Sequence, residues 1–202
     1  IPYGKSVWYM DVKDKSGNII GQTVTDEYSD ATQYLCGAPT PDLYGGFGTS
    51  LEFYGFDVSA SFTYSVGGLT YDSGYAGYMT NPSSGGGDNY HKDILNAWTP
   101  ENPDSNIPRW QYGDLYPAST SDRFLVDASY LNFQNAQIGY TLPQKVTQKF
   151  NVNKLRLYVA CDNIVYWSYR KGLDPRYSFS GSTNNAVNSP IRTISGGVNI
   201  TF

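Results

Sequence analysis

The sequence predicts an all-β protein whose antiparallel strands cross a membrane, and three observations support this fold class. The composition favours strands, with 19 Tyr, 21 Gly and 9 Phe but only 16% charged residues, whereas soluble domains average about 25% charged. Several segments of about ten residues alternate between apolar and polar side chains, as strands with one lipid-facing side do. The connections between these segments alternate between short and long.

The same composition excludes other classes of protein. No run of about 18 apolar residues is present, so a transmembrane helix is excluded. A net charge of −4 argues against a nucleic acid partner, because nucleic acid demands a basic surface. The two cysteines, Cys36 and Cys161, lie far apart in different sequence contexts, so a disulfide between them remains open.

Residues 1–44 are mostly irregular and predict an extracellular loop that contains a hairpin. Residues 6–12 and 19–25 are expected to pair, because glycine and asparagine between them supply a turn. The acidic residues of segment 11–18 resemble a calcium loop, but the required spacing and the closing glutamate are missing. A plain turn without metal is therefore the favoured interpretation.

Residues 45–66 form the clearest hairpin, with strands at 46–54 and 56–66 and Gly55 at the tight connection. The apolar positions of the second strand are Phe56, Val58, Ala60, Phe62, Tyr64 and Val66, and small polar or acidic residues separate them. About ten residues are what a tilted strand needs to cross the hydrocarbon layer. Aromatic residues near both ends of this strand are typical of interfacial girdles.

A long extracellular loop is expected at 67–127, with a glycine-rich stretch at 83–87 and a short helix at 91–98. A connection of this length in a compact protein is usually functional. Outer-membrane barrels commonly carry long loops on one side and short turns on the other.

Residues 128–163 predict a second hairpin, with strands at 131–142 and 155–162. The apolar positions change parity within the first of these strands, so a bulge is expected near Asn135 or Ala136. Cys161 continues the apolar side of the second strand, where it acts as a small hydrophobic residue.

An extracellular loop at 164–190 leads into a terminal strand at 191–202. Its apolar residues share one parity and end on Phe202, while small polar residues occupy the other parity. If this strand runs toward the periplasm, Gly55 and residues 143–153 are periplasmic turns, and every long segment lies outside. Five strands are too few for a closed barrel, which needs about eight. The chain is therefore expected to be the carboxy-terminal fragment of one larger β-barrel domain.

Sequence motifs point to a particular family. The run from Phe124 to Pro143, FLVDASYLNFQNAQIGYTLP, closely resembles the carboxy-terminal signature of SusC-like (RagA-type) TonB-dependent outer-membrane transporters. Further matching pieces are Gly45-Gly46-Phe47, Tyr54-Gly55-Phe56-Asp57, Leu155-Arg156-Leu157-Tyr158-Val159, Asp162-Asn163, Gly172-Leu173-Asp174-Pro175-Arg176, Pro190-Ile191-Arg192-Thr193 and Phe202. These pieces follow the family order over most of residues 37–202.

The resemblance implies a multi-pass barrel of about 22 strands in the cell outer membrane, with an amino-terminal plug domain that is not present in this sequence. It implies import of oligosaccharides or peptides, a SusD-like surface lipoprotein as a lid, and TonB as the source of energy, contacted through the absent plug. Phe202 resembles the signal that the barrel-insertion machinery reads, the alternative being an apolar residue at the lipid boundary. A soluble carbohydrate-binding β-sandwich module is the alternative function.

No catalytic constellation is visible, so the chain is not expected to be an enzyme. The single histidine, His91, lies in a polar loop, and Asp57 and Asp162 are inward-facing acids that would matter only in a glycan hydrolase. Neither a cofactor nor a metal site is predicted.

Aromatic side chains in the two long loops are the candidate contact residues. The residues are Trp98, Arg109, Trp110, Tyr112 and Tyr116 in the first loop and Trp167 and Tyr169 in the second. Flat aromatic rings suit sugar rings, and tryptophan, tyrosine and arginine also concentrate at protein interfaces. Contact with the cargo, contact with the lid protein and internal packing therefore all remain open, with an interfacial girdle as a further alternative for the second loop.

Overall fold

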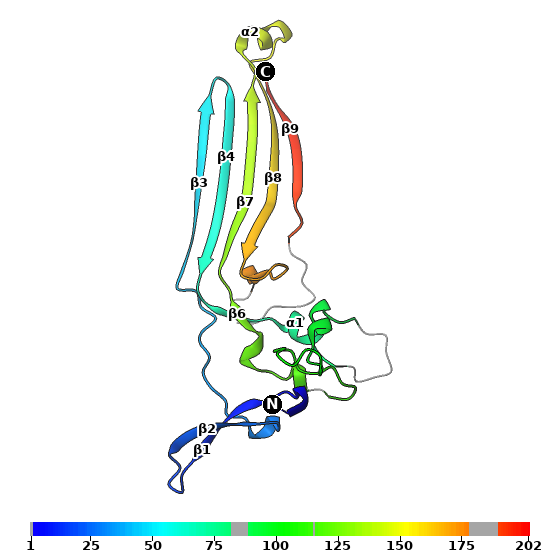
Figure 1. Cartoon of the computed structure of the whole chain (residues 1–202). Helices are drawn as coiled ribbons and strands as arrows, with labels where there is room; N and C mark the ends of the chain where they lie inside the picture. Colours follow the sequence, from blue (N-terminus) through cyan, green and yellow to red (C-terminus); the bar gives the residue numbers. More distant parts are fainter. Residues whose placement is uncertain (1, 82–88, 115, 178–189) are drawn as a thin grey trace. The chain divides into compact units, whose positions relative to one another are not determined.

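A computed structural model describes residues 2–81, 89–114, 116–177 and 190–202 (Figure 1). The chain forms two compact units. One, here called the loop unit, comprises Ile1–Gly37 and Tyr71–Leu125; the other, the sheet unit, comprises Ala38–Thr70 and Val126–Phe202. No helix in the described part of the chain is long and apolar enough to cross a membrane.

The sheet unit is built on five long antiparallel strands in the order β3-β4-β7-β8-β9 (Figure 1). The strands are β3 (Leu43–Phe53), β4 (Phe56–Val66), β7 (Tyr130–Thr141), β8 (Lys154–Ser168) and β9 (Thr193–Thr201). This arrangement confirms the predicted all-β class and antiparallel pairing. One boundary is wrong, because β8 continues to Ser168 instead of giving way to a loop at residue 164.

Local sequence explains how the strands are joined and aligned. Tyr54 and Gly55 both have positive φ, 48° and 88°, as a two-residue turn between twisted strands requires. Against β4, Ser61 pairs with Asn135 and Phe62 pairs with Phe133, which leaves Gln134 as an extra residue on β7. This bulge lies next to the expected position, and it brings the two apolar parities of β7 onto one face.

The sheet has one apolar and one polar face, since directly paired residues of antiparallel strands share a side. The apolar face comprises Phe47, Leu51, Phe53, Phe56, Val58, Phe62, Tyr64, Leu131, Phe133, Ile138, Tyr140, Leu157, Val159, Cys161, Ile194, Val198 and Ile200. Many of these side chains are exposed, among them Leu51 at 60% and Val198 at 56%. An exposed apolar surface of this extent needs lipid or another protein to cover it.

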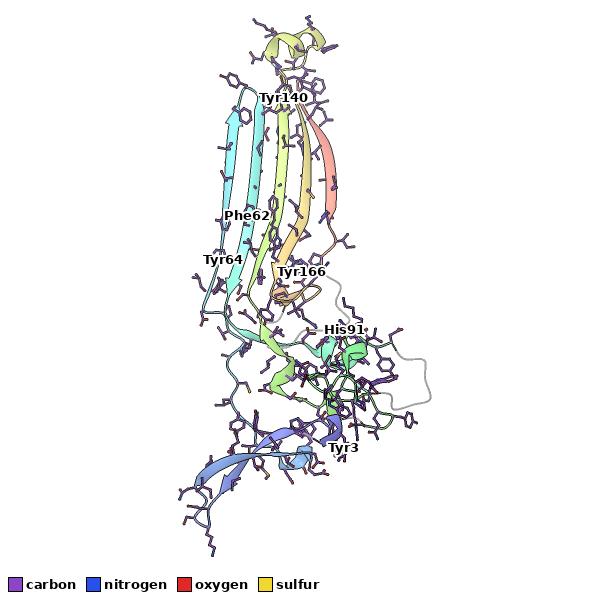
Figure 2. All side chains as sticks on the ribbon, viewed as in Figure 1. Tyr3, Phe62, Tyr64, His91, Tyr140 and Tyr166 are labelled. Carbon is purple, nitrogen blue, oxygen red and sulfur yellow. The ribbon has the colours of Figure 1, made fainter. Side chains whose placement is uncertain are left out.

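Aromatic rings form two rows across the apolar face. Phe62 stacks on Phe47 and Phe133, with ring centroids 4.9 and 4.5 Å away. Phe56 contacts Phe53 and Tyr140, at 5.8 and 4.5 Å. The two rows are six residues apart along β4, which is roughly 20 Å. Figure 2 shows Tyr140 toward one end of the sheet and Tyr64 toward the other, as interfacial girdles would place them.

The connections at the two ends of the sheet differ. Two residues join β3 to β4. The connection from β7 to β8 contains α2 (Gln144–Thr147) and the 3₁₀ turn η6 (Gln148–Phe150). At the other end, β5 (Leu69–Tyr71) pairs with β6 (Leu125–Asp127) where the chain passes between the units. The 3₁₀ turn η7 (Pro175–Tyr177) follows β8.

The loop unit is folded, although the sequence predicted mostly irregular structure there. Its elements are η1 (Pro2–Gly4), β1 (Trp8–Lys13), β2 (Ile19–Thr25), η2 (Tyr28–Asp30), α1 (Ser73–Tyr78), η3 (Lys92–Asn96), η4 (Tyr116–Ala118) and η5 (Asp122–Phe124). Ala76, Met79 and Phe124 form its small core. The short helix expected at 91–98 is the 3₁₀ turn η3, and the glycine-rich stretch at 83–87 lies outside the described residues.

The β1–β2 hairpin confirms the predicted pairing, and backbone hydrogen bonds between Asp14 and Asn18 and between Gly17 and Asp14 close its turn. One carboxylate oxygen of Asp14 accepts hydrogen bonds from the backbone N–H groups of Ser16 and Asn18, at 2.8 and 2.9 Å. Chiefly because of the bonds from Asn18, the pKa of Asp14 lies below its usual value. Among the described residues, no group of three or more His, Cys, Asp and Glu side chains gathers as a metal site would require. Cys36 and Cys161 are both free thiols.

Candidate functional site

Trp98 is an internal packing residue of the loop unit. Its ring covers Gly4, where an added Cβ would lie only 2.5 Å from the nearest ring atom. Its backbone N–H donates to the carbonyl of Ile107 at 2.9 Å. Of the interpretations left open by the sequence, packing is the one that this geometry favours for Trp98.

Arg109 is fixed at its backbone by two hydrogen bonds. Its backbone N–H donates to the carbonyl of Gly4 at 2.8 Å, and its carbonyl accepts from the amide of buried Asn81 at 3.4 Å. Its Nε is buried and has no hydrogen-bond partner among the described residues. The residue therefore helps to join the start of the chain to the loop around Trp110.

Tyr116 belongs to an aromatic cluster that the sequence did not predict. Trp8 contacts Tyr28 and Tyr116 edge to face, with ring centroids 5.3 and 5.6 Å away. The hydroxyl of Tyr28 donates to the carbonyl of Thr120 at 2.9 Å. Tyr116 is still 43% exposed, so the cluster presents an aromatic surface. No sequence signal links β1 with residue 116, which is why Trp8 and Tyr28 were missed.

Trp110 and Tyr112 are the most accessible aromatic candidates of the first loop. Trp110 meets Tyr90 edge to face at 5.5 Å and remains 50% exposed, and Tyr112 is 65% exposed. Together with Tyr116 they offer ring faces to a sugar, a peptide or another protein. They are more exposed than Trp98, whose half-buried ring packs on Gly4.

His91 lies in a hydrogen-bonded cluster rather than beside a nucleophile. The Tyr75 hydroxyl donates to the Asp93 carboxylate at 2.8 Å, and His91 Nδ1 accepts from the Asp93 backbone N–H at 3.2 Å. Burial, and then the Asp93 carboxylate, raise the pKa of Tyr75 to about 12. A neutral tyrosine that donates to a carboxylate stabilises the loop unit. Figure 2 labels His91.

The second pair of aromatic candidates belongs to the end of β8. Trp167 pairs with Leu131 on the apolar face and is 52% exposed, so it does not lie in a loop as the sequence suggested. This position favours the interfacial girdle for Trp167. Tyr169 follows the strand and is exposed. Phe202, which is also exposed, follows β9.

The polar face carries an ion pair that bridges three strands. The guanidinium of Arg156 on β8 crosses Gly139 on β7 and donates to Asp57 on β4, with Nε 2.8 Å from Oδ1. Beside it, the ring of Tyr158 lies over Gly197 of β9, where an added Cβ would come within 2.5 Å of the tyrosine hydroxyl oxygen. Glycine is needed at both positions because a neighbouring side chain occupies the space above it.

A second network fixes the segment after β8 to the other end of the polar face. Arg176 donates to both carboxylate oxygens of Asp174, at 2.8 and 2.6 Å, and to the amide oxygen of Asn132 at 3.1 Å. Its guanidinium also lies 4.7 Å from the ring centroid of Tyr166. The amide of buried Asn132 donates to Thr63 at 3.3 Å. The Gly172–Arg176 motif is therefore a structural anchor on β4, β7 and β8.

The inward-facing acids do not form a hydrolytic pair. Asp57 is held by Arg156, and Asp162 accepts from the amide of Asn135 at 2.7 Å. Their partners in register on β7, Gly139 and Asn135, are four residues apart, roughly 13 Å. Glycosidase carboxylates lie within about 10 Å of each other.

Comparison with known proteins finds similar sequences among TonB-dependent receptors. No protein-family model matches the chain. TonB-dependent receptor P3 of Formosa agariphila is 30% identical over 186 residues, which are 87% of this chain and 18% of the receptor. TonB-dependent receptor P26 of the same organism is 26% identical over 177 residues, 83% of this chain and 18% of the receptor.

Solved structures match in fold as well as in sequence. The RagAB peptide importer in its closed-closed state has a TM-score of 0.75 and 26% identity, over 98% of this chain and 21% of the importer chain. A further structure of the RagAB peptide transporter gives 0.76 and 26%, with the same coverage. This chain thus spans about a fifth of the length of these relatives. With its amphipathic antiparallel strands, the chain belongs to the SusC-like (RagA-type) family of TonB-dependent outer-membrane β-barrel transporters.

Proposed function

We propose that the protein imports oligosaccharides or peptides across the outer membrane, with a SusD-like surface lipoprotein as its lid and TonB as its source of energy. The observation that carries this is the five-stranded sheet, which has an exposed apolar face, a polar face and short connections at one end only. The receptors and importers that it resembles are not enzymes, and the separation of Asp57 and Asp162 argues against hydrolysis here.

The loop unit is the part that we assign to recognition. Trp110, Tyr112 and Tyr116 are exposed in this unit, and the rings of Trp110 and Tyr116 are held edge to face by Tyr90 and Trp8. We propose an orientation in which the Tyr54–Gly55 turn and α2 face the periplasm, so that the long connections at the other end of the sheet begin and end outside the cell. Large rigid aromatics give much contact area at little entropic cost.

Two readouts separate contact with the cargo from contact with the lid. The full-length protein carrying Trp110→Ala and Tyr112→Ala is compared with a Tyr9→Ala control, which removes an equally exposed ring from β1 of the same unit. A lid contact predicts about a tenfold weaker capture of the lipoprotein. A cargo contact predicts slower uptake of labelled glycan or peptide with normal capture of the lipoprotein.

The importer itself is tested by growth. A strain lacking the full-length protein should fail to grow on one class, glycans or peptides, and should recover when the protein is restored. A strain lacking TonB should show the same defect. Equal growth of all strains on every glycan and peptide offered would contradict the proposal.

A further inference from the structure

We propose that the connection between β7 and β8 binds anionic phospholipid. In this proposal Lys145 and Lys149 bind headgroup phosphates at the membrane surface, while Phe150 enters the lipid beside them. The inference rests on the outer-membrane location of the sheet and does not depend on which cargo is imported.

Positive charge is concentrated in this connection. Residues 143–154 contain three lysines and no acidic residue, although the whole chain has a net charge of −4. The remaining residues therefore carry −7. Among the described residues, neither Lys145 nor Lys149 lies in a salt bridge. Both are exposed and are available to an external anion.

The side chains of α2 and η6 are arranged as at a membrane surface. Lys145 and Lys149 are four residues apart, as are Val146 and Phe150, so each pair forms a row along this helical segment. Val146 is 41% and Phe150 72% exposed. Adjacent basic and apolar rows are typical of segments that lie in the interface, where lysine stems cover apolar surface while the ammonium groups reach phosphate.

The connection is held firmly to the end of the sheet. The Thr147 side chain is 1% exposed, and its carbonyl accepts from the Val152 N–H at 3.2 Å. The Asn153 N–H donates to the Thr201 carbonyl of β9 at 2.8 Å. Tyr140, in the second aromatic row of the apolar face, precedes α2 by only four residues and lies at the same end of the sheet (Figure 2). The lysines are thus placed where hydrocarbon gives way to headgroups.

The test uses the full-length protein with Phe150→Trp in bilayer discs of phosphatidylcholine. Brominated phosphatidylglycerol is added to one sample and brominated phosphatidylcholine to another, at the same mole fraction. The fluorescence of the new tryptophan is obtained by subtracting that of the parent protein, and its quenching by each lipid is measured. Each lysine at the surface is expected to enrich anionic lipid roughly fivefold. Brominated phosphatidylglycerol should therefore quench severalfold more strongly, and Lys145→Gln with Lys149→Gln should remove that excess. The matched control, Lys13→Gln with Lys15→Gln on the β1–β2 hairpin, should leave it unchanged.

Equal quenching by the two lipids, or an excess that survives loss of both lysines, would overturn the proposal. If neither lipid quenches the tryptophan and iodide in water does not quench it, a protein covers the turn instead of lipid, and the proposal is wrong. If Phe150→Trp does not assemble, the unsubstituted protein and its double glutamine variant are compared for phospholipid retained in native mass spectra. Equal retention would again refute binding. Cargo uptake is not measured in either experiment, so a wrong importer assignment would not alter the outcome.

Discussion

Gly139 is the residue whose substitution tests the ion pair on the polar face most sharply. An added Cβ would lie 2.5 Å from Arg156 Nη2 and 2.5 Å from Asp57 Oδ1. Ordinary contacts of carbon lie at about 3.5 Å or more. Both partners of the pair must therefore move by about 1 Å in Gly139→Ala, and the hydrogen bonds between them are lost or stretched.

The structure provides the magnitude and the control. Hydrogen bonds to charged groups contribute about 1.5–3 kcal/mol, and the lower end applies here because the Arg156 and Asp57 side chains keep 16% and 26% of their exposure. Replacing an extended glycine with alanine also stabilises by about 0.4–1 kcal/mol through the unfolded state, and a control with the same replacement cancels this contribution. Gly196→Ala is the matched control, since its Cβ would meet only the Tyr158 carbonyl oxygen, 3.6 Å away.

We therefore expect Gly139→Ala to be less stable than Gly196→Ala by about 2 kcal/mol. The assay is equilibrium urea unfolding of the full-length protein in phospholipid vesicles. The free energies of unfolding are compared between variants whose dependence on urea concentration has the same slope. Adding Asp57→Asn should narrow the gap, because the pair is then already broken. Equal stability of the two alanine variants would refute the assignment of Gly139 to this ion pair.

Three further predictions concern Arg176, Tyr75 and Phe202. Arg176→Met should lower the free energy of unfolding by about 3 kcal/mol, since it removes the guanidinium that pairs with the largely buried Asp174 carboxylate. Adding Asp174→Asn should recover part of the loss, and an unchanged stability of Arg176→Met would contradict the anchor. The raised pKa of Tyr75 contributes stability in full below about pH 10, the ordinary tyrosine pKa, and this stability is lost as the pH rises through about 12. In an absorbance titration, the difference in tyrosinate absorbance between the parent protein and Tyr75→Phe should therefore appear near pH 12 rather than near pH 10. Phe202→Ser should reduce the amount of heat-resistant barrel in the outer membrane severalfold, whereas normal amounts would favour a mere boundary residue.

Alternation in the sequence predicted the sheet well, because lipid on one side imposes a period of two on every strand. It predicted β4 to the residue, and it predicted a bulge near Asn135 or Ala136, which the structure places next to them at Gln134. The end of β8 was misplaced because Asn163, with a φ of 51°, interrupts the alternation and imitates the start of a loop.

The contact surfaces were only partly predictable. Trp98 and Trp110 look alike in sequence, yet one covers Gly4 and the other remains half-exposed. In the Trp8–Tyr28–Tyr116 cluster, Tyr116 contacts Trp8, which lies 108 positions earlier in the chain, and no local pattern encodes such a contact. For the same reason the partners of Arg156 and Arg176 could not be read from spacing.

Alternate exposure of the β9 strand to lipid and water is the measurement that tests the central claim most directly. Single cysteines replace Val198 or Asn199 in a full-length protein without Cys36 and Cys161, and each is labelled with a fluorophore in vesicles. The apolar-face label should be quenched by brominated lipid and the polar-face label by iodide in water. Protection of both labels from both quenchers would mean that the apolar face is buried in a dry protein core, and the membrane sheet would be the wrong structure.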